Sequence, residues 1–408
     1  MTVPGARLRR RGAGASAVRA ADRALHRIGA IGRRVWRLRY DRAQSFTDAG
    51  DMREGEGGTF AGRLLAWFER CGRHYLPWQQ NPTPYRVWVS EVMLQQTQVA
   101  AVIPYFDRFM QRFPDVQALA AAPLDEVLHL WTGLGYYARA RNLQAAARLV
   151  VGQYGSEFPA AIDELIALPG IGRSTAGAIL ALAHGQRQPI LDGNVKRVLA
   201  RVFGIEGDPG SAPVVAALWV RTDACTPERR VAAYTQAIMD LGATVCTRSR
   251  PACELCPMHG DCVAFRDGRQ AQLPGRRRRH ARRSREATLL IAEVSLDGTR
   301  AVLLERRPAP GIWGGLWSPP QFDSEPAALA WCRREFSEAA VSAAVLAPIE
   351  HAFTHFDLRL HPVRVLCRGD GDGAVRDRDD RLWYALAAPP RVGLPQPIRT
   401  LLARLGAE

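Results

Sequence analysis

The sequence has 408 residues, of which 47% are hydrophobic and 23% are charged, so the chain can bury substantial cores and is expected to form two domains. Its apolar runs stay well short of the roughly 18 to 20 residues that a membrane-spanning helix needs, which predicts a soluble protein. The net charge of +15 favours a polyanionic partner. Four of the eight cysteines lie in one short segment, which indicates metal ligation in a reducing compartment instead of a disulfide framework.

The first 51 residues are rich in arginine, alanine and glycine and contain few apolar anchors, so no packed fold is expected there. An organellar transit peptide has a similar composition. Because an ordinary apolar pattern begins soon after Met52, we interpret residues 1–51 as a disordered basic extension or a wrongly assigned start.

The segment Tyr85–Gln98 has the periodicity of a helix, and Glu91 shares one of its faces with apolar side chains and has no cation three or four residues away. If Glu91 is buried there, its pKa is raised and it can act as a general acid near neutral pH. The alternative is a solvent-facing glutamate on an amphipathic helix. Four uncharged polar residues follow: Gln95, Gln96, Thr97 and Gln98. Their side chains could read base edges or fill the space that a base leaves in a duplex. The alternative is that they are ordinary surface residues of the helix.

Helical patterns continue through 104–112 and 124–130 to a glycine-rich segment, residues 132–142. Glycines there allow a close backbone approach, so Tyr136 could stack between bases while Arg139 and Arg141 meet phosphates. Core packing is the ordinary alternative for the tyrosine.

Residues 168–198 combine two devices. Pro169, Gly170 and Gly172 separate an apolar run from a helix that opens at Arg173, which predicts a helix-hairpin-helix whose backbone N–H groups bind a DNA phosphate. Asp192 precedes a second amphipathic helix. It could be only an N-cap, but its position, some twenty residues beyond the phosphate site, would let it face a DNA sugar.

After two more predicted helices, 211–222 and 228–243, four cysteines follow within 17 residues: Cys246, Cys253, Cys256 and Cys262. An all-sulfur set of this kind binds zinc or an iron–sulfur cluster, and ligand type alone does not separate the two. Arg248 and Arg250 lie in the loop between the first two cysteines and would project toward DNA.

A basic linker is predicted over 267–286, including Arg276–Arg279. Beyond it, strands are expected at 288–294, 301–306, 358–366 and 382–385 and a helix at 326–336, which together give an α+β domain.

These motifs together resemble the helix-hairpin-helix DNA glycosylase superfamily, and specifically the adenine DNA glycosylase (MutY) family. The resemblance covers about residues 60 to 400 and rests on Leu-Pro-Gly-Ile-Gly (168–172) and Leu-Asp-Gly-Asn-Val-Lys-Arg-Val (191–198). It implies a mainly α-helical core with a cluster loop and a C-terminal α+β Nudix-like domain. The implied activity is the excision of adenine opposite 8-oxoguanine or guanine in base excision repair.

The resemblance also assigns roles to residues. Glu91 would protonate the adenine, Asp192 would stabilise the positively charged sugar and Asn194 would orient Asp192. The cysteine spacing matches the family's single [4Fe–4S] cluster, with zinc as the fallback. DNA-binding roles fall on Gln95, which enters the base stack, on the intercalating Tyr136, and on Gln96, Thr97, Gly170, Gly172, Ser174, Lys196, Arg248 and Arg250.

In the C-terminal part, Gly-Ile-Trp-Gly-Gly-Leu-Trp-Ser-Pro-Pro (311–320) resembles the Nudix-like domain of the same glycosylases. Phe353, Thr354 and His355 match the loop by which that family reads 8-oxoguanine, with Thr where relatives often have Ser. The segment 334–338 lacks the full acidic Nudix motif, so diphosphate hydrolysis is not expected.

An endonuclease III-like lyase acting on oxidised pyrimidines is the main alternative. That branch has a Schiff-base lysine where this chain has Ser174, although Lys196, the single lysine, could react incidentally with the product. A non-catalytic DNA-binding protein would leave Glu91 and Asp192 unused.

The predicted domains are therefore the extension 1–51, a glycosylase core with its cluster loop over 52–266, the linker 267–286 and a Nudix-like recognition domain over 287–408. We expect a monomer that binds double-stranded DNA, with repair or sliding-clamp proteins as further partners and no membrane. The expected location is the bacterial cytoplasm, at the nucleoid.

Overall fold

A computed structural model describes residues 58–275, 282–296, 298–309, 311–336, 340–367 and 380–408. The predicted extension 1–51 and the arginine run 276–279 lie outside these residues. Among the described helices, none combines the length and the apolar character needed to cross a bilayer.

The N-terminal part is helical. Its elements are α2 (Phe60–Cys71), η1 (Pro77–Gln79), α3 (Pro84–Leu94), α4 (Val99–Arg112), α5 (Val116–Ala121), α6 (Leu124–Trp131), α7 (Ala138–Tyr154), α8 (Ile162–Ala167), α9 (Arg173–His184), α10 (Gly193–Val202), α11 (Ala212–Cys225), α12 (Val231–Asp240), the π-helical turn η2 (Leu241–Val245), η3 (Cys253–Leu255), η4 (His259–Asp261) and α13 (Val263–Arg266).

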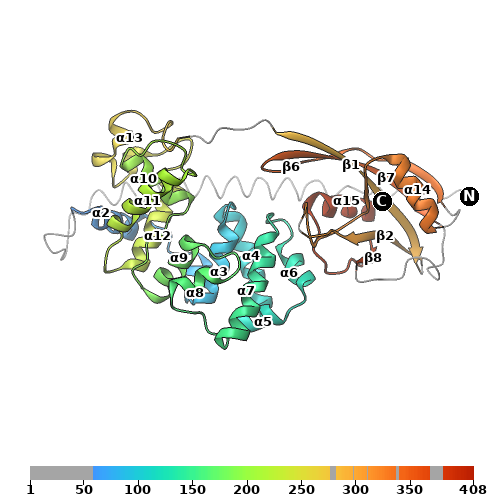
Figure 1. Cartoon of the computed structure of the whole chain (residues 1–408), viewed down its shortest axis with the longest axis horizontal. Coiled ribbons are helices and arrows are strands. Elements are labelled where there is room, and N and C mark those ends of the chain that lie inside the picture. The colour runs from blue at the N-terminus through green and yellow to red at the C-terminus, as the bar shows by residue number, and fades with distance from the viewer. Residues whose placement is uncertain (1–57, 276–281, 297, 310, 337–339, 368–379) are drawn as a thin grey trace, which may run out of the picture.

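Two apolar cores support this helical part. One is built from α3 to α9 and contains large buried rings such as Trp88, Phe106 and Trp131. The other joins α2, α10 and α12 to the cysteine segment. Each core forms one lobe of the helical part. The helix α9 contacts both α3 and α12, so it connects the two lobes and fixes how they face each other (Figure 1).

The C-terminal part is a mixed sheet with two helices. Its elements are β1 (Arg283–Leu296), β2 (Thr299–Arg306), β3 (Trp317–Ser318), β4 (Gln321–Phe322), α14 (Glu325–Phe336), β5 (Ala340–Val345), β6 (Ile349–Ala352), β7 (Phe356–Cys367), β8 (Arg381–Ala385) and α15 (Gln396–Ala407).

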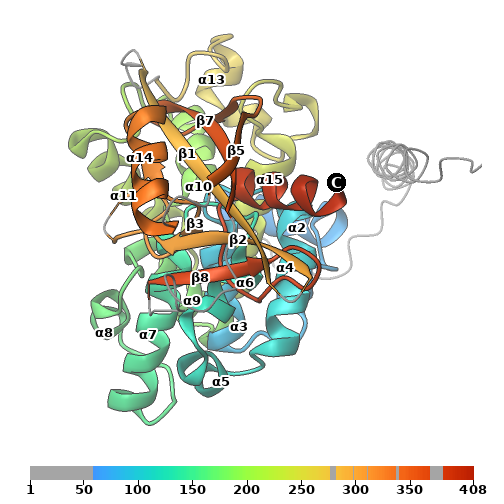
Figure 2. The ribbon, with the colours of Figure 1, turned by 90° about the vertical axis from the view of Figure 1, so that its right-hand side faces the viewer.

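The sheet has the order β3-β2-β1-β7-β5, and β4, β6 and β8 pair with β1, β7 and β2. The long central strands β1 and β7 run parallel, from Arg283 opposite Phe356 to Glu293 opposite Leu366. Successive residues of a strand point to opposite faces. On β1, Leu290 and Ala292 accordingly pack with α14, whereas Leu289 and Ile291 belong to the core that includes α15 (Figure 2).

The expected fold class is confirmed: a helical core followed by an α+β domain. Two boundaries differ from the predictions. The helix predicted to reach Gln98 ends at Leu94, and β1 begins at Arg283, inside the range predicted as a linker. The structure also adds short strands and the C-terminal helix α15 that sequence periodicity did not indicate.

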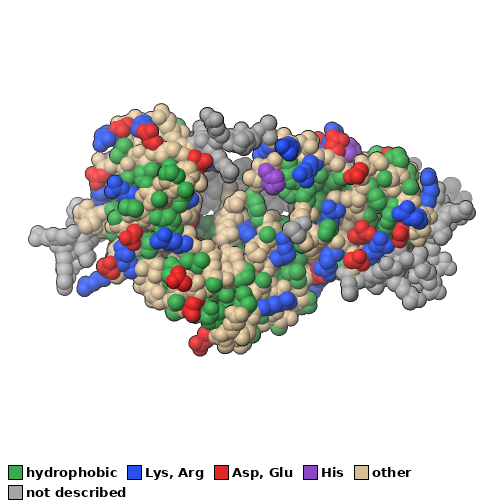
Figure 3. Space-filling model, viewed as in Figure 1, with side chains coloured by type: hydrophobic (Ala, Val, Ile, Leu, Met, Phe, Trp, Pro, Cys, Tyr) green, Lys and Arg blue, Asp and Glu red, His purple; other side chains and the backbone are tan. Residues whose placement is uncertain are grey.

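The two parts dock on each other through α6 and the turn that follows it. One continuous apolar core contains Leu128 and Trp131 from the helical part and Leu316 and Leu394 from the sheet domain. Away from this contact the surface is hollowed between the two parts, and Lys and Arg side chains occur on both (Figure 3). The molecule therefore presents two lobes and a sheet domain in a fixed arrangement.

Candidate active site

Asp192 is the N-cap of α10. Its Oδ1 accepts a hydrogen bond from the Val195 N–H at 2.8 Å, and its Oδ2 accepts one from Asn194 Nδ2 at 3.1 Å. Burial raises the pKa of the Asp192 carboxyl, while these donors and the charge of Arg197 oppose that rise. Capping and a chemical role therefore do not exclude each other, because only part of the carboxylate is used by the helix.

Glu91 lies on α3, across from Asp192. Burial, and to a smaller extent the negative charge of Asp192, raises the pKa of Glu91 to about 8. Within the described part of the chain, no hydrogen bond or ion pair involves the Glu91 side chain. A carboxyl in this setting keeps its proton near neutral pH, which a general acid requires. Glu91 is partly buried, so it is not the solvent-facing glutamate of the alternative.

The backbone that carries Asp192 is held by the start of α9. The Ser174 hydroxyl accepts a hydrogen bond from the Leu191 N–H at 3.0 Å. Gly177, one turn later, leaves room for the chain, because a Cβ there would lie 2.8 Å from the carbonyl oxygen of Pro189. Ser174 thus has an internal partner, and its predicted DNA contact stays a prediction.

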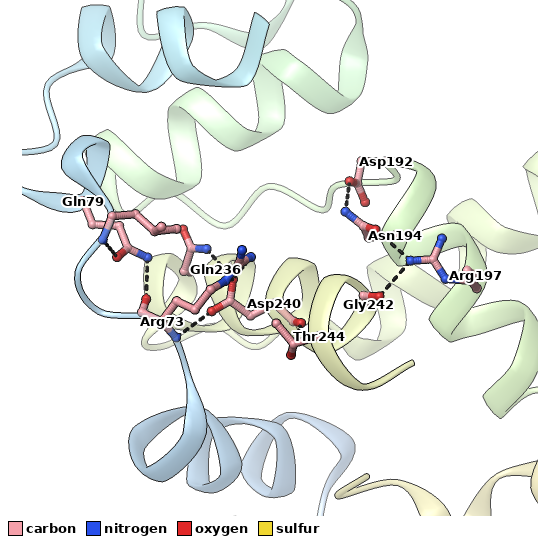
Figure 4. Close-up of polar contacts among 10 residues, drawn as sticks. Arg73, Gln79, Asp192, Asn194, Arg197, Gln236, Asp240, Gly242 and Thr244 are labelled. Carbon is pink, nitrogen blue, oxygen red and sulfur yellow. Dashed lines mark hydrogen bonds and ion pairs between the residues drawn. The ribbon is translucent and has the colours of Figure 1, made fainter. Parts of the chain in front are cut away.

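Arg197 connects Asn194 to the cysteine segment (Figure 4). Its Nη2 donates to Asn194 Oδ1 and to the Gly242 carbonyl, both at 2.8 Å, and its Nε donates to the Cys246 carbonyl at 2.7 Å. Asn194 in turn donates to Asp192. A chain of hydrogen bonds therefore runs from the first cysteine to the candidate catalytic carboxylate.

The hairpin between α8 and α9 has the predicted form. Gly170 has a left-handed φ of 78°, and a Cβ on it would lie 2.8 Å from Asn142 Cβ, so only glycine fits. Gly172 is the exposed N-cap of α9 and offers no side-chain cap, which leaves the first N–H groups of the helix available to an anion. Lys196, also predicted to bind DNA, donates one hydrogen bond to the Pro209 carbonyl at 3.1 Å, and its DNA contact stays a prediction.

Gln95, Gln96 and Thr97 form the turn between α3 and α4. Gln96 is exposed and has a left-handed φ of 58°. Tyr136 lies in a second such turn, with a φ of 48° and 48% of its side chain exposed. Its core-packing alternative is therefore wrong, and its stacking role stays a prediction.

Arg139 and Arg141 do not take the predicted phosphate-binding positions. Both guanidinium groups turn inward to backbone carbonyls: Arg141 Nη1 donates to Gly314 of the sheet domain at 2.5 Å, and Arg139 donates to the two turns just described. The Nη donors of Arg139 and Nη1 of Arg141 therefore have acceptors inside the protein, as partly buried donors require.

Phe353, Thr354 and His355 form the connection between β6 and β7. Phe353 stacks on Phe356 with ring centroids 4.4 Å apart, which fixes the loop, while Thr354 and His355 are exposed. The Thr354 hydroxyl lies 3.1 Å from the Tyr136 hydroxyl. The structure therefore brings together two segments separated by 218 residues in the sequence.

The four clustered cysteines line one cavity, together with Arg201. Arg201 is a buried cation on α10. Its Nη1 donates to Cys246 Sγ at 3.3 Å and to the Thr247 carbonyl at 2.7 Å. Arg248 and Arg250 are exposed on the loop, where they were predicted to project. In the described residues, no three His, Cys, Asp or Glu side chains are grouped as a site for a single metal ion.

Comparisons with known proteins agree with this geometry. Residues 89–223 match the HhH-GPD superfamily of base excision DNA repair proteins, and residues 292–404 match the NUDIX domain. The chain is 34% identical over 343 residues to the adenine DNA glycosylase of Buchnera aphidicola subsp. Schizaphis graminum, which covers 84% of this chain and 97% of that protein. The chain belongs to the adenine DNA glycosylase family. It is therefore a DNA glycosylase, an enzyme that hydrolyses N-glycosidic bonds.

A mammalian adenine DNA glycosylase and a solved DNA glycosylase structure are also similar to this glycosylase. The Mus musculus adenine DNA glycosylase is 39% identical over 329 residues, which is 69% of this chain and 63% of that protein. Among solved structures, a thermostable thymine-DNA glycosylase is 27% identical and aligns with a TM-score of 0.47 over 51% of this chain and 95% of that one.

Sequence reasoning missed a buried polar network of this glycosylase (Figure 4). Asp240 on α12 is buried and accepts hydrogen bonds from the Arg73 backbone N–H at 2.8 Å, from Arg73 Nε at 3.0 Å and from Gln236 Nε2 at 2.9 Å. Gln79 in turn donates to the Arg73 carbonyl. The available signal was an aspartate inside an apolar helical run, because a buried carboxylate requires a cationic partner.

Proposed function

We propose that this glycosylase removes adenine from A:8-oxoguanine and A:guanine mispairs in duplex DNA. The single observation that carries the proposal is the placement of Glu91, which has no hydrogen-bond partner among the described residues and whose pKa is raised by burial, opposite the hydrogen-bonded Asp192 beside a helix-hairpin-helix. The family relationship supports adenine as the base, because the relatives bear that name.

The first step is extrusion of the adenine, because the glycosidic bond is out of reach in a stacked duplex; unstacking costs a few kcal/mol. The hairpin glycines Gly170 and Gly172 hold the backbone through their N–H groups, with Arg248, Arg250 and Lys196 adding positive charge. Gln95 and Tyr136 enter the stack that the adenine leaves, and Gln96 and Thr97 lie beside them.

The bond is then broken by acid catalysis. Glu91 donates its proton to the adenine, which becomes a neutral leaving group, and the electrons of the C–N bond leave with the base. Asp192 stabilises the positive charge that develops on the sugar, while Asn194 holds the Asp192 carboxylate in place. Water then adds to the sugar and leaves an abasic site.

The sheet domain supplies the reading of the opposite base. Phe353, Thr354 and His355 form the contact to 8-oxoguanine, and the Thr354 hydroxyl keeps the hydrogen-bonding group that this loop needs. Its position next to Tyr136 supports this role, because a base beside the Tyr136 wedge would meet the same loop.

The four cysteines fit a [4Fe–4S] cluster. They surround one cavity, and the buried Arg201 next to Cys246 Sγ would offset the negative charge of thiolate ligands. Cys246, Cys253, Cys256 and Cys262 would hold the cluster, which when bound fixes the loop that carries Arg248 and Arg250.

The test is single-turnover base release from three duplexes: adenine opposite 8-oxoguanine, adenine opposite guanine, and oxidised thymine opposite adenine. Strand breaks are scored before and after alkali. Release of adenine with breaks mainly after alkali is the expected result. Release of the oxidised pyrimidine with spontaneous breaks that depend on Lys196 would identify a lyase instead, and DNA binding without base release would leave a binding protein.

A further inference from the structure

Arg139 on α7 makes an unusual number of contacts for one side chain. Its Nη1 donates to the carbonyls of Val92, Met93 and Gln95 at 2.8, 3.0 and 2.6 Å, and its Nη2 donates to Thr97 Oγ1, Leu134 O and Gly135 O at 3.3, 3.1 and 3.1 Å. The first four acceptors belong to the end of α3 and the turn after it. The last two directly precede Tyr136. One guanidinium therefore connects two turns that are about forty residues apart in the sequence.

Both turns need such support because of their backbone conformation. Gln96 and Tyr136 are non-glycine residues with positive φ, a conformation that is unfavourable for residues with a Cβ. The guanidinium also lies 5.4 Å from the centre of the Trp131 ring and 5.6 Å from that of the Tyr136 ring. Arg139 thus braces the base of Tyr136 while the ring itself remains half exposed.

The Gln95 turn and Arg139 meet the hairpin at one place. A single cavity is lined by Gln95, Arg139 and Asn142 together with Pro169 and Gly170. A duplex whose backbone is bound at the hairpin would therefore meet the Gln95 turn next to Arg139, the residue that also contacts the Tyr136 turn.

We propose that Arg139 is a positioning residue that holds the Gln95 turn and the Tyr136 turn in fixed register, so that both side chains enter the duplex together. This inference rests on the proposed function, in which Gln95 and Tyr136 fill the stack. Arg139 does not touch the reacting atoms. It determines how readily the adenine leaves the helix, and it leaves the chemistry of Glu91 unchanged.

Only arginine satisfies this set of acceptors. The six contacts are made by its two Nη atoms, which the planar guanidinium holds apart so that one faces the end of α3 and the other the Tyr136 turn, whereas a lysine ammonium carries its three donors at one point. The pKa of Arg139 is lowered by burial to about 10, so its charge is retained at neutral pH. A lysine at this position would keep the positive charge but lose the hydrogen bonds that connect the two turns.

The test compares Arg139→Lys with wild type on two duplexes, each with adenine opposite 8-oxoguanine. One is otherwise fully paired. In the other, mismatched pairs flank the adenine. The adenine is then already partly unstacked, and insertion of Gln95 and Tyr136 is needed less. The ratio of the two single-turnover rates is taken from one protein sample, so an inactive fraction does not affect it.

We expect Arg139→Lys to lower the rate on the fully paired duplex by about tenfold or more and to lower the rate on the flanked duplex much less. The matched control is Arg148→Lys on the same helix, an exposed arginine that donates only to the Ala120 carbonyl. It should change neither rate. If Arg139→Lys does not fold, Thr97→Val removes one of the six acceptors and should lower the same ratio by about twofold.

Equal losses on both duplexes, or no loss on either, would overturn the positioning role. This outcome is distinct from failure of the proposed function, in which the wild-type protein itself releases no adenine from either duplex. A second readout is 2-aminopurine at the adenine position, whose fluorescence rise on extrusion should be smaller with Arg139→Lys than with wild type or Arg148→Lys.

Discussion

The carboxyl groups of Asp192 and Glu91 have different surroundings, and these favour different charge states. Asp192 has hydrogen-bond donors from Val195 and Asn194, which favour its charged form. Glu91 has no such donor among the described residues, and burial together with the charge of Asp192 favours its neutral form. In the proposed reaction each group would serve one half: Glu91 as a proton donor for the base and Asp192 as a negative charge for the sugar.

The raised pKa of Glu91 should cost the protein stability at alkaline pH. Its pKa is about 8 in the folded protein, against an ordinary value of 4.5, so the folded state holds an extra proton between these values and stability falls as the pH rises through this window. Glu91→Gln should therefore be more stable than wild type at about pH 9, by roughly 1–3 kcal/mol, with little difference near pH 5. Urea denaturation at both pH values measures this. An equal difference at both would show that Glu91 ionises normally.

Substitution of Asp192 can separate its two roles. Asparagine caps helices as well as aspartate does, so Asp192→Asn should keep the stability of α10 and lower adenine release by about 100-fold or more. Asp192→Ala should lose the same activity and, in addition, about 1 kcal/mol of unfolding free energy. Thermal unfolding and single-turnover excision are measured on both variants. An active Asp192→Asn would remove the electrostatic role.

Among single residues, those that belong to motifs could be predicted as site residues from the sequence. Glu91, Asp192 and the four cysteines could be chosen because residue type and spacing restrict their chemistry. The contacts of Arg139 and Arg201 could not be predicted, since these are two of many arginines and most of their acceptors are backbone carbonyls more than forty residues away in the sequence. The predicted phosphate contact of Arg139 was wrong for this reason.

At the scale of elements, most helices and long strands could be predicted from periodicity, but the end of α3 could not. Gln95 to Gln98 contain no glycine or proline, so nothing local stops the helix before Gln98. Contacts from Arg139 to the last carbonyls of α3 stabilise the turn instead. The short strands were missed because two residues are too few to show a period.

The cysteine segment should behave as one element that depends on its cofactor. We expect about four irons and four sulfides per chain for the wild type, and loss of both, with weaker DNA binding, for Cys253→Ser. Cys225→Ser, outside the segment, should retain the cluster. Iron and acid-labile sulfide analysis measures this. One zinc per chain without sulfide would identify a zinc site instead.

For the whole molecule, the docking of the sheet domain on α6 determines where the proposed recognition loop, residues 353–355, lies. Asp125 is central to it: Arg306 donates to Oδ1 and Oδ2 at 3.1 and 2.8 Å, and Trp317 Nε1 donates to Oδ1 at 3.0 Å. The Tyr137 hydroxyl adds a bond to the Leu394 carbonyl at 2.9 Å. Because the same domain carries Thr354, these contacts hold the loop next to Tyr136.

Loosening this contact should therefore reduce discrimination and leave the chemistry intact. Asp125→Asn keeps the shape of the side chain but loses the two-pronged pair with Arg306, at a cost of about 1–3 kcal/mol. We expect the rate on adenine opposite 8-oxoguanine to fall about threefold to tenfold, with the rate opposite guanine unchanged, because only the former depends on the recognition loop. Single-turnover rates on both duplexes measure the ratio.

The neighbouring residue offers a matched control for this prediction. Glu126 also forms a two-pronged pair, with Arg112 at 2.5 and 2.7 Å, but entirely within the helical part. Glu126→Gln removes an interaction of the same kind and should leave the ratio of the two rates as in the wild type. If both variants lower both rates equally, α6 supports the fold in general and the docked position of the sheet domain does not determine which opposite base is preferred.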